Sequence, residues 1–157
     1  MMNERYKALI DRNTAERQMK RRCGTLGRKA VGNRREGASG NDDLFVSLST
    51  SNGKRGVKHS ICMRLKGEFA DAYDLKIGDF VTVDYDNSPE GCIFVMKKAC
   101  PKTGVMFYKT SQESGIRTAF TPEEEDLQNL FSDTKRYWCE LKHVDDATGV
   151  MVFEELK

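Results

Sequence analysis

Apolar and polar positions alternate over short runs from residue 43 onward, as they do in half-buried β-strands. Strand candidates in the first half of this region are 44–48, 60–65, 80–85 and 92–96. The Asn52-Gly53 pair between the first two runs supplies the positive φ angle of a hairpin turn. A short helix that ends near Gly78 is expected between the second and third runs. The predicted order is therefore hairpin, helix, hairpin.

The same order recurs in the second half of the chain. Strand candidates there are 105–108, 116–120, 137–141 and 150–153. The helix between them is predicted to begin with Thr121 at the N-cap, Pro122 at the first helical position and Glu124 completing a capping box. Leu127, Leu130 and Phe131 form its expected buried stripe.

Individual residues agree between the two halves. At an offset of 55, Ile61, Leu65 and Gly67 fall on Ile116, Phe120 and Pro122. At an offset of 58, Val83, Gly91, Ile93 and Val95 fall on Leu141, Gly149, Met151 and Phe153. Each copy is too small to bury a core alone. We therefore expect a mainly β (α+β) fold, a pseudo-twofold barrel built from two ββαββ repeats, 43–100 and 101–157, that form one domain.

Two segments of the first repeat carry a family resemblance. Ile61–Phe69, leading into Leu75–Val83, resembles the AbrB-like swapped-hairpin domain of the SpoVT/AbrB, MazE and MraZ proteins. Leu75–Asp79 keeps the family's turn before the third strand, whereas Lys66-Gly67 stands where the family usually has a proline. The resemblance implies a barrel of two interleaved copies that binds DNA through basic side chains of the first hairpin, as a transcription regulator or antitoxin does.

Carried over by position, the nucleic-acid-binding candidates of the first hairpin are Lys54, Arg55, Lys58, His59, Arg64 and Lys66. The matching stretch of the second copy, 109–121, holds only Lys109 and Arg117 as cations, and an acidic run follows it. That run supplies the candidates for contact with a protein partner, Glu123, Glu124, Glu125 and Asp126. The first repeat is therefore suited to contact phosphate groups, and the second repeat is not.

Charge is distributed unevenly along the 157 residues, although 26 Lys and Arg nearly balance 24 Asp and Glu. Residues 1–40 carry eleven basic and four acidic side chains, a charge of +7, and the remainder carries −5. The arm, 1–42, is rich in glycine and poor in apolar residues, so we expect it to be flexible alone or to order on binding. Its phosphate-binding candidates are Lys20, Arg21, Arg22, Arg28, Lys29, Arg34 and Arg35. Three alternatives remain open for this arm: it binds a nucleic acid, it binds an acidic protein surface, or it has no partner.

Several classes of protein and site are not indicated. No apolar run approaches the roughly 20 residues of a membrane span, and no signal peptide is recognisable, so a cytoplasmic, nucleoid-associated location is expected. The five cysteines contain no C-x-x-C pair, and a site mixing Cys92, Cys100, His59 and His143 matches no ligand spacing. Nucleotide-binding, hydrolase and metal motifs are missing, so we expect neither an enzyme nor a cofactor.

Three functions fit these patterns. The first is a non-enzymatic DNA-binding regulator of prokaryotic, phage or plasmid origin, a pseudo-dimeric monomer or a homodimer, that prefers duplex DNA without excluding RNA. The second is an adaptor that docks on a protein machine such as RNA polymerase, and the third is a nucleic-acid-packaging protein. Trp138 and Phe94 are expected to be barrel residues and not base-stacking platforms.

Overall fold

The computed structural model describes residues 4–15, 43–54, 56–109, 115–131 and 136–156. Its helices are α1 (Glu4–Thr14), α2 (Gly67–Ala72) and α3 (Glu124–Phe131). Its strands are β1 (Leu44–Gly53), β2 (Gly56–Leu65), β3 (Phe80–Ser88), β4 (Gly91–Ala99), β5 (Val105–Met106), β6 (Tyr108–Lys109), β7 (Ile116–Phe120), β8 (Arg136–Asp145) and β9 (Val150–Glu155). The prediction of a mainly β fold is confirmed.

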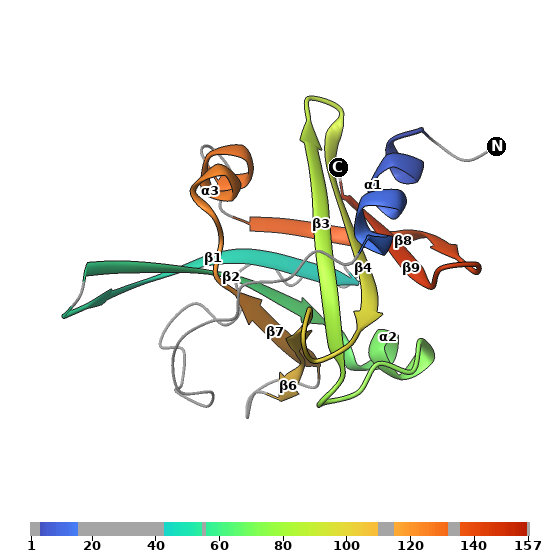
Figure 1. Cartoon of the computed structure of the whole chain (residues 1–157), viewed down its shortest axis with the longest axis horizontal. Helices are drawn as coiled ribbons and strands as arrows, with labels where there is room; N and C mark the ends of the chain where they lie inside the picture. Colours follow the sequence, from blue (N-terminus) through green and yellow to red (C-terminus); the bar gives the residue numbers. More distant parts are fainter. Residues whose placement is uncertain (1–3, 16–42, 55, 110–114, 132–135, 157) are drawn as a thin grey trace.

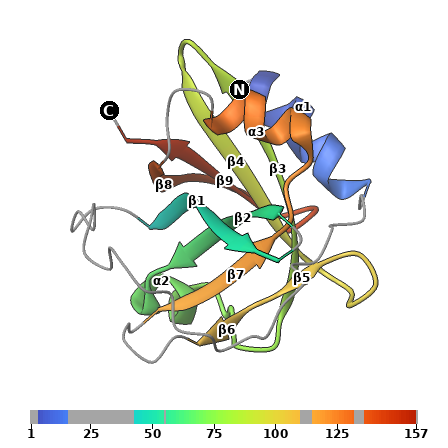
Figure 2. The same ribbon diagram turned by 90° about the vertical axis from the view of Figure 1, so that its left-hand side faces the viewer.

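All described strands belong to one antiparallel sheet, in the order β5-β3-β4-β9-β8-β1-β2-β7-β6. The two outermost strands, β5 and β6, are separated only by Phe107. Counted as one interrupted strand, they make the sheet an eight-stranded, nearly closed barrel (Figures 1 and 2). Phe107 keeps the join in place because its N–H donates to the Asp79 carbonyl at 2.9 Å, while its own carbonyl accepts from the N–H of Gly78.

Along the strands, every second side chain points into the barrel core. Val81 and Val83 point into it from β3, and Phe94 and Phe153 lie there opposite each other on β4 and β9. Tyr137 packs edge-on against Phe94 and donates its hydroxyl to the carbonyl of Leu130 in α3. Phe94 is thus a barrel-core residue, as predicted.

Helix α1 covers the outside of the barrel, which differs from the expectation that residues 1–42 form one flexible arm. Leu9 and Ile10 are buried against apolar side chains that point outward from β4 and β9. Figure 1 shows α1 lying beside these strands. Those outward side chains are Ile93, Val95, Val150 and Val152. Asn13 completes the contact by donating to the Thr82 carbonyl and to Asp84, both at 3.2 Å. An apolar outer face needs cover, and the first turns of the arm supply it.

The alignment of the last strand of each half is wrong by one residue. At an offset of 58, outward-facing Ile93 falls on Met151, which lies in the barrel core. A one-residue shift exchanges the two faces of a strand, so an offset of 57, which places Ile93 on Val150, keeps inside and outside consistent. The strand registers give the same result: Val83 pairs with Met96 and Leu141 pairs with Phe153, so the second hairpin is one residue shorter between these corresponding pairs.

The start of α3 also differs from its prediction, because the helix begins at Glu124 and not next to Thr121. The N–H of Glu123 donates to the Asp126 carboxylate at 2.9 Å, and its carbonyl accepts from the N–H of Leu127. Glu123 is therefore the N-cap residue, and the side chain of Asp126, three residues later, accepts its N–H. Leu130 and Phe131 are buried as predicted, whereas Leu127 is only partly so.

Candidate nucleic-acid interface

The β1–β2 hairpin projects from the barrel. Strand β1 pairs with β8 only as far as Ser47, and β2 pairs with β7 only from Ile61 onward. Residues 48–53 and 56–60 pair with each other alone and extend away from the body as a two-stranded ribbon (Figure 1). We call these residues, with the turn between them, the ribbon. The six residues of its longer strand, at roughly 3.3 Å each, give it a length of about 20 Å.

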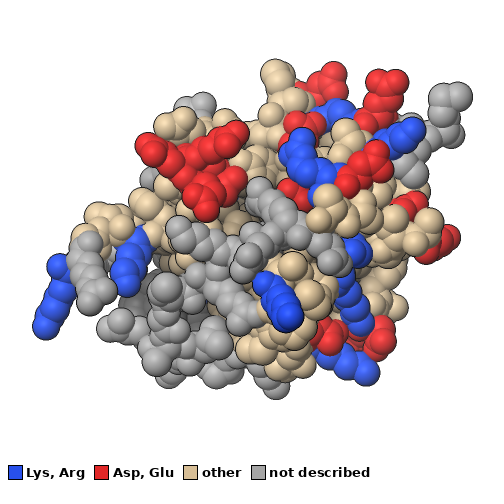
Figure 3. Space-filling model, in the orientation of Figure 1, with Lys and Arg blue, Asp and Glu red and all other residues tan. Residues whose placement is uncertain are grey.

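The end of the ribbon is basic. Lys54 and Lys58 are exposed, and Figure 3 shows cationic side chains at the projecting end. His59 is half-buried, with its Nδ1 atom 3.1 Å from the Thr50 hydroxyl across the hairpin. Arg55 lies outside the described residues. Segment 44–66 contains five Lys and Arg and no Asp or Glu, so no carboxylate of its own offsets this charge.

Arg64 and Lys66 lie at the base of the hairpin, apart from the ribbon. Arg64 is six residues along β2 from Lys58, a separation of about 20 Å in a strand. Its guanidinium lies over the Phe45 ring, 5.1 Å from the ring centroid. Lys66 is the N-cap residue of α2 and is partly exposed. The structure therefore divides the predicted hairpin residues into a distal group and a group on the barrel wall.

The barrel wall carries a row of side chains that was not anticipated. The strand registers place five outward-facing residues side by side across β8, β1, β2, β7 and β6: Trp138, Phe45, Arg64, Arg117 and Tyr108. We call these five the aromatic–arginine row. All of them are partly exposed. Trp138 is a barrel residue as predicted, but it faces outward, and its ring lies 5.6 Å from that of Phe45.

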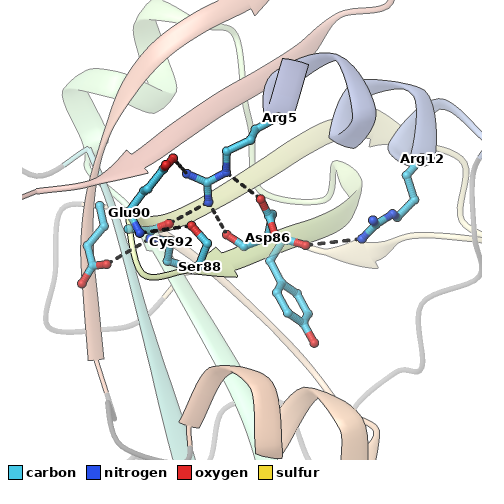
Figure 4. Close-up of polar contacts among 9 residues, drawn as sticks. Arg5, Arg12, Asp86, Ser88, Glu90 and Cys92 are labelled. Carbon is cyan, nitrogen blue, oxygen red and sulfur yellow. Dashed lines mark hydrogen bonds and ion pairs between the residues drawn. The ribbon is translucent and has the colours of Figure 1, made fainter. Parts of the chain in front are cut away.

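The basic residues of the N-terminal segment fall into two classes. Arg5 and Arg12 are held by the barrel: Arg5 binds Asp86 at 2.7 Å and the Gly91 carbonyl at 2.8 Å, and Arg12 donates to the Tyr85 carbonyl at 3.4 Å (Figure 4). Seven predicted phosphate contacts lie outside the described residues: Lys20, Arg21, Arg22, Arg28, Lys29, Arg34 and Arg35. Their role stays a prediction.

The predicted protein-partner residues lie at the start of α3, where Glu123, Glu124 and Glu125 are exposed and form an acidic patch (Figure 3). Asp126 differs, since only 6% of it is exposed. Its carboxylate accepts the Tyr85 hydroxyl at 2.7 Å, and burial together with this bond raises the pKa of Tyr85. Asp126 is therefore a capping and packing residue and is not available to a partner. Beside it, an open hollow of about 370 Å³ separates α3 from Arg12 and β3.

The described cysteines are free thiols that differ in exposure. Within the described residues, no three His, Cys, Asp or Glu side chains gather closely enough to hold a metal ion. Cys92 and Cys139 are buried and Cys100 is exposed. Burial raises the pKa of the Cys92 thiol, which keeps it protonated at neutral pH.

No family model matches the chain, and neither curated proteins nor solved structures show a significant similarity to it. Among the described helices, none has the length and apolar character needed to cross a bilayer.

Proposed function

We propose that the protein is a non-enzymatic DNA-binding protein that grips duplex phosphates through the ribbon, with the basic segment after α1 reaching neighbouring phosphates. A role as a transcription regulator of prokaryotic, phage or plasmid origin, in the nucleoid, is the context in which this activity is expected. The observation that carries the proposal is a projecting two-stranded ribbon with exposed Lys54 and Lys58 and no carboxylate between residues 44 and 66.

The size of the ribbon fits a duplex. The major groove of B-DNA is about 12 Å wide and about 8.5 Å deep, and it admits a two-stranded β-ribbon. The ribbon, at about 20 Å, is longer than the groove is deep, so its tip can reach the floor of the groove while the barrel stays outside the phosphate backbone. Val57, 58% exposed between the two lysines, places an apolar side chain where it can meet base edges.

We further propose that the barrel arose from two fused ββαββ units, as the AbrB-like resemblance implies. Strand pairing supports this. Leu48 pairs with Ile61 in the first hairpin, and Lys109 pairs with Ile116 in the second, so the units correspond at offsets of 61 and 55. An offset of 61 takes Leu44 to Val105, and the offset of 58 between β3 and β8 takes Cys139 back to Val81. The pair between Leu44 and Cys139 therefore predicts a pair between Val105 and Val81. That pair is formed.

The two units differ in the part that would reach DNA. Twelve residues separate Leu48 from Ile61, whereas six separate Lys109 from Ile116. The second hairpin therefore has six fewer residues beyond this pair than the first, and the acidic patch follows it in the chain. A one-sided grip on the duplex follows from this difference, in place of the two-sided grip that symmetric dimers use.

The experiment compares the full chain with a K54Q/K58Q variant in titrations of duplex DNA at several salt concentrations. Each phosphate contact contributes roughly 0.9 to the slope of log K against log salt, so losing two contacts should reduce the slope by about 1.8. If the remaining contacts are unchanged, affinity at 0.1 M salt falls about 60-fold. Both changes are measured by fluorescence anisotropy of a labelled duplex.

The matched control is K7Q/K102Q, which removes two exposed lysines from α1 and from the turn after β4. It changes the net charge equally and should leave the slope within about 0.5 of the unmodified value, because distant surface charges are screened beyond about 10 Å at 0.1 M salt. Equal losses in the two variants would mean that net charge, and not the ribbon, governs binding.

A second candidate function is the adaptor, and the exposed acidic patch Glu123–Glu125 favours it. In that case the patch meets a basic surface of a machine such as RNA polymerase, and the basic segment orders against that partner or its nucleic acid. An E123Q/E124Q/E125Q variant should then lose binding to nuclease-treated RNA polymerase while K54Q/K58Q retains it. Unchanged binding of the triple variant would exclude this role for the patch.

A further inference from the structure

We propose that the ribbon distinguishes base sequences in the major groove of duplex DNA. Val57 contacts the methyl group of a thymine, and His59 donates a hydrogen bond to the N7 atom of a purine. This inference rests on the proposed binding of duplex phosphates by the ribbon, and it adds the chemistry by which one duplex is preferred over another.

The ribbon has two chemically different faces, because successive side chains of a strand point to opposite sides. Thr50 is the cross-strand partner of His59, and Val57 lies two residues before His59, so these three share one face. We call it the reading face. The opposite face, which we call the serine–lysine face, carries hydroxyl groups and an ammonium group, from Ser49, Ser60 and Lys58.

The serine–lysine face matches a phosphodiester backbone. Ser49 and Lys58 are exposed and Ser60 is partly exposed. Their hydroxyl and ammonium groups are donors that phosphate oxygens accept, and such contacts fix the position of a protein without reading sequence. A ribbon that leans with this face against one wall of the groove turns its reading face toward the base edges.

Val57 suits a base edge better than a phosphate. Its side chain is 58% exposed, the largest exposed fraction among the large apolar residues that the structure describes. Its methyl groups form no hydrogen bond, so contact with a phosphate would remove water from a charged group without replacing it. The thymine C5-methyl is the apolar group that base pairs present in the major groove. Contact between the two removes apolar surface of both from water.

The His59 ring is held by a neighbour on the same face. Its Nδ1 atom lies 3.1 Å from the Thr50 hydroxyl. When that hydroxyl donates to Nδ1, the proton of the neutral ring is on Nε2, which donates to an acceptor such as a purine N7. Two residues along a strand span about 6.6 Å, close to two base steps of about 3.4 Å each. A ribbon inclined along the groove therefore brings Val57 and His59 to bases two steps apart.

Altered bases test each contact without changing the sequence. The unmodified chain is titrated with an alternating dA–dT duplex of about 16 base pairs and with the matching dA–dU duplex, which lacks only the methyl groups in the major groove. Thymine should be preferred about fourfold, as expected for burial of one methyl group. Replacing adenine by 7-deazaadenine, which lacks the N7 acceptor, should weaken binding about fivefold through the loss of one hydrogen bond.

Variants of the chain complete the test. Val57→Ala should bind the dA–dT and dA–dU duplexes equally, and His59→Leu should no longer distinguish adenine from 7-deazaadenine. Both should keep the salt slope, since neither residue contacts a phosphate. The matched control Ile77→Ala truncates an apolar side chain that is 54% exposed outside the ribbon, and it should keep both preferences. K54Q/K58Q should lower the salt slope by about 1.8 while the thymine preference persists.

Equal binding of the dA–dT and dA–dU duplexes by the unmodified chain would overturn the base-reading proposal. If that binding still depended on salt and on Lys54 and Lys58, the proposed function would stand without it. A thymine preference that survives in Val57→Ala, or that disappears in Ile77→Ala, would also overturn base reading by Val57. Absence of any duplex binding would contradict both the proposed function and this inference.

Discussion

Docking of α1 on the barrel gives a sharp prediction for the Leu9→Ala variant. Leu9 is 1% exposed and packs with Ile10 on four outward-facing apolar residues of β4 and β9. Truncating a buried leucine to alanine costs about 2–5 kcal/mol, and a small cluster at the edge of the molecule can partly close the space. We therefore expect a loss near the lower end, about 2–3 kcal/mol.

This loss of stabilising free energy should favour detachment of α1 before it favours unfolding of the barrel. The barrel core inside the strands does not include Leu9, so α1 can detach while the sheet stays folded. A docking free energy lowered by about 2–3 kcal/mol raises the exchange rates of the helix-bonded amides, residues 8–14, roughly 30- to 150-fold at 1.36 kcal/mol per factor of ten. Amides of β1 and β2 should exchange as before.

Hydrogen–deuterium exchange read by NMR or mass spectrometry measures this effect. The matched control is Ile77→Ala, which truncates an apolar side chain that is 54% exposed and should leave α1 protection unchanged. If α1 amides exchange equally fast in the unmodified chain and in the Leu9→Ala variant, the helix is not held by this apolar contact, and the reasoning fails.

Three further predictions concern stability. The Gly115→Ala variant should lose at least about 2–3 kcal/mol of unfolding free energy in urea denaturation, because the new Cβ would lie 2.1 Å from the Leu65 carbonyl oxygen. The control Gly56→Ala, at a φ of 104° with no atom within 4 Å of the new Cβ, should lose only about 1–2 kcal/mol. Stability should fall as the pH rises above 10, the ordinary pKa of a tyrosine, because the phenol of Tyr85 ionises in the unfolded chain while its raised pKa keeps it neutral in the fold. The Tyr85→Phe variant should show a shallower decline of stability with pH, and an unchanged slope would contradict the assignment. Arg5→Gln should cost about 0.5–1.5 kcal/mol and speed α1 amide exchange, since it removes bonds to Asp86 and to the Gly91 carbonyl; unaltered exchange would show that the pair is not stabilising.

Alternation was sufficient to predict the strands, since each described strand overlaps a predicted run. The turn of the first hairpin was misplaced, because Asn52 and Gly53 belong to β1 and pair with Val57 and Gly56, so the chain turns after Gly53. The docking of α1 was missed although a signal existed. Residues 92–96 form an unbroken apolar run without alternation, which is typical of a strand covered on both faces. The barrel interior covers one face of that run, so something else had to cover the other.

The aromatic–arginine row could not be found from the sequence, because it depends on which strands are neighbours. Phe45, Arg64 and Trp138 are each the outward residue of a separate strand, and only the closed sheet order places them together. The α3 start was misjudged for a local reason, since both Thr121 and Glu123 precede a carboxylate at capping distance along the chain. The exposure of Lys54 and Lys58 was predictable, because a lysine side chain is almost never fully buried unless it is paired.

The most direct test of the central claim is an NMR titration of the full, uniformly ¹⁵N-labelled chain with a duplex of about 15 base pairs. The account predicts the largest shift changes at residues 48–54 and 56–60, with the amides of α2 and of the α1–β4–β9 contact unmoved. It is contradicted if the ribbon amides stay in place at saturating duplex while another face of the barrel responds.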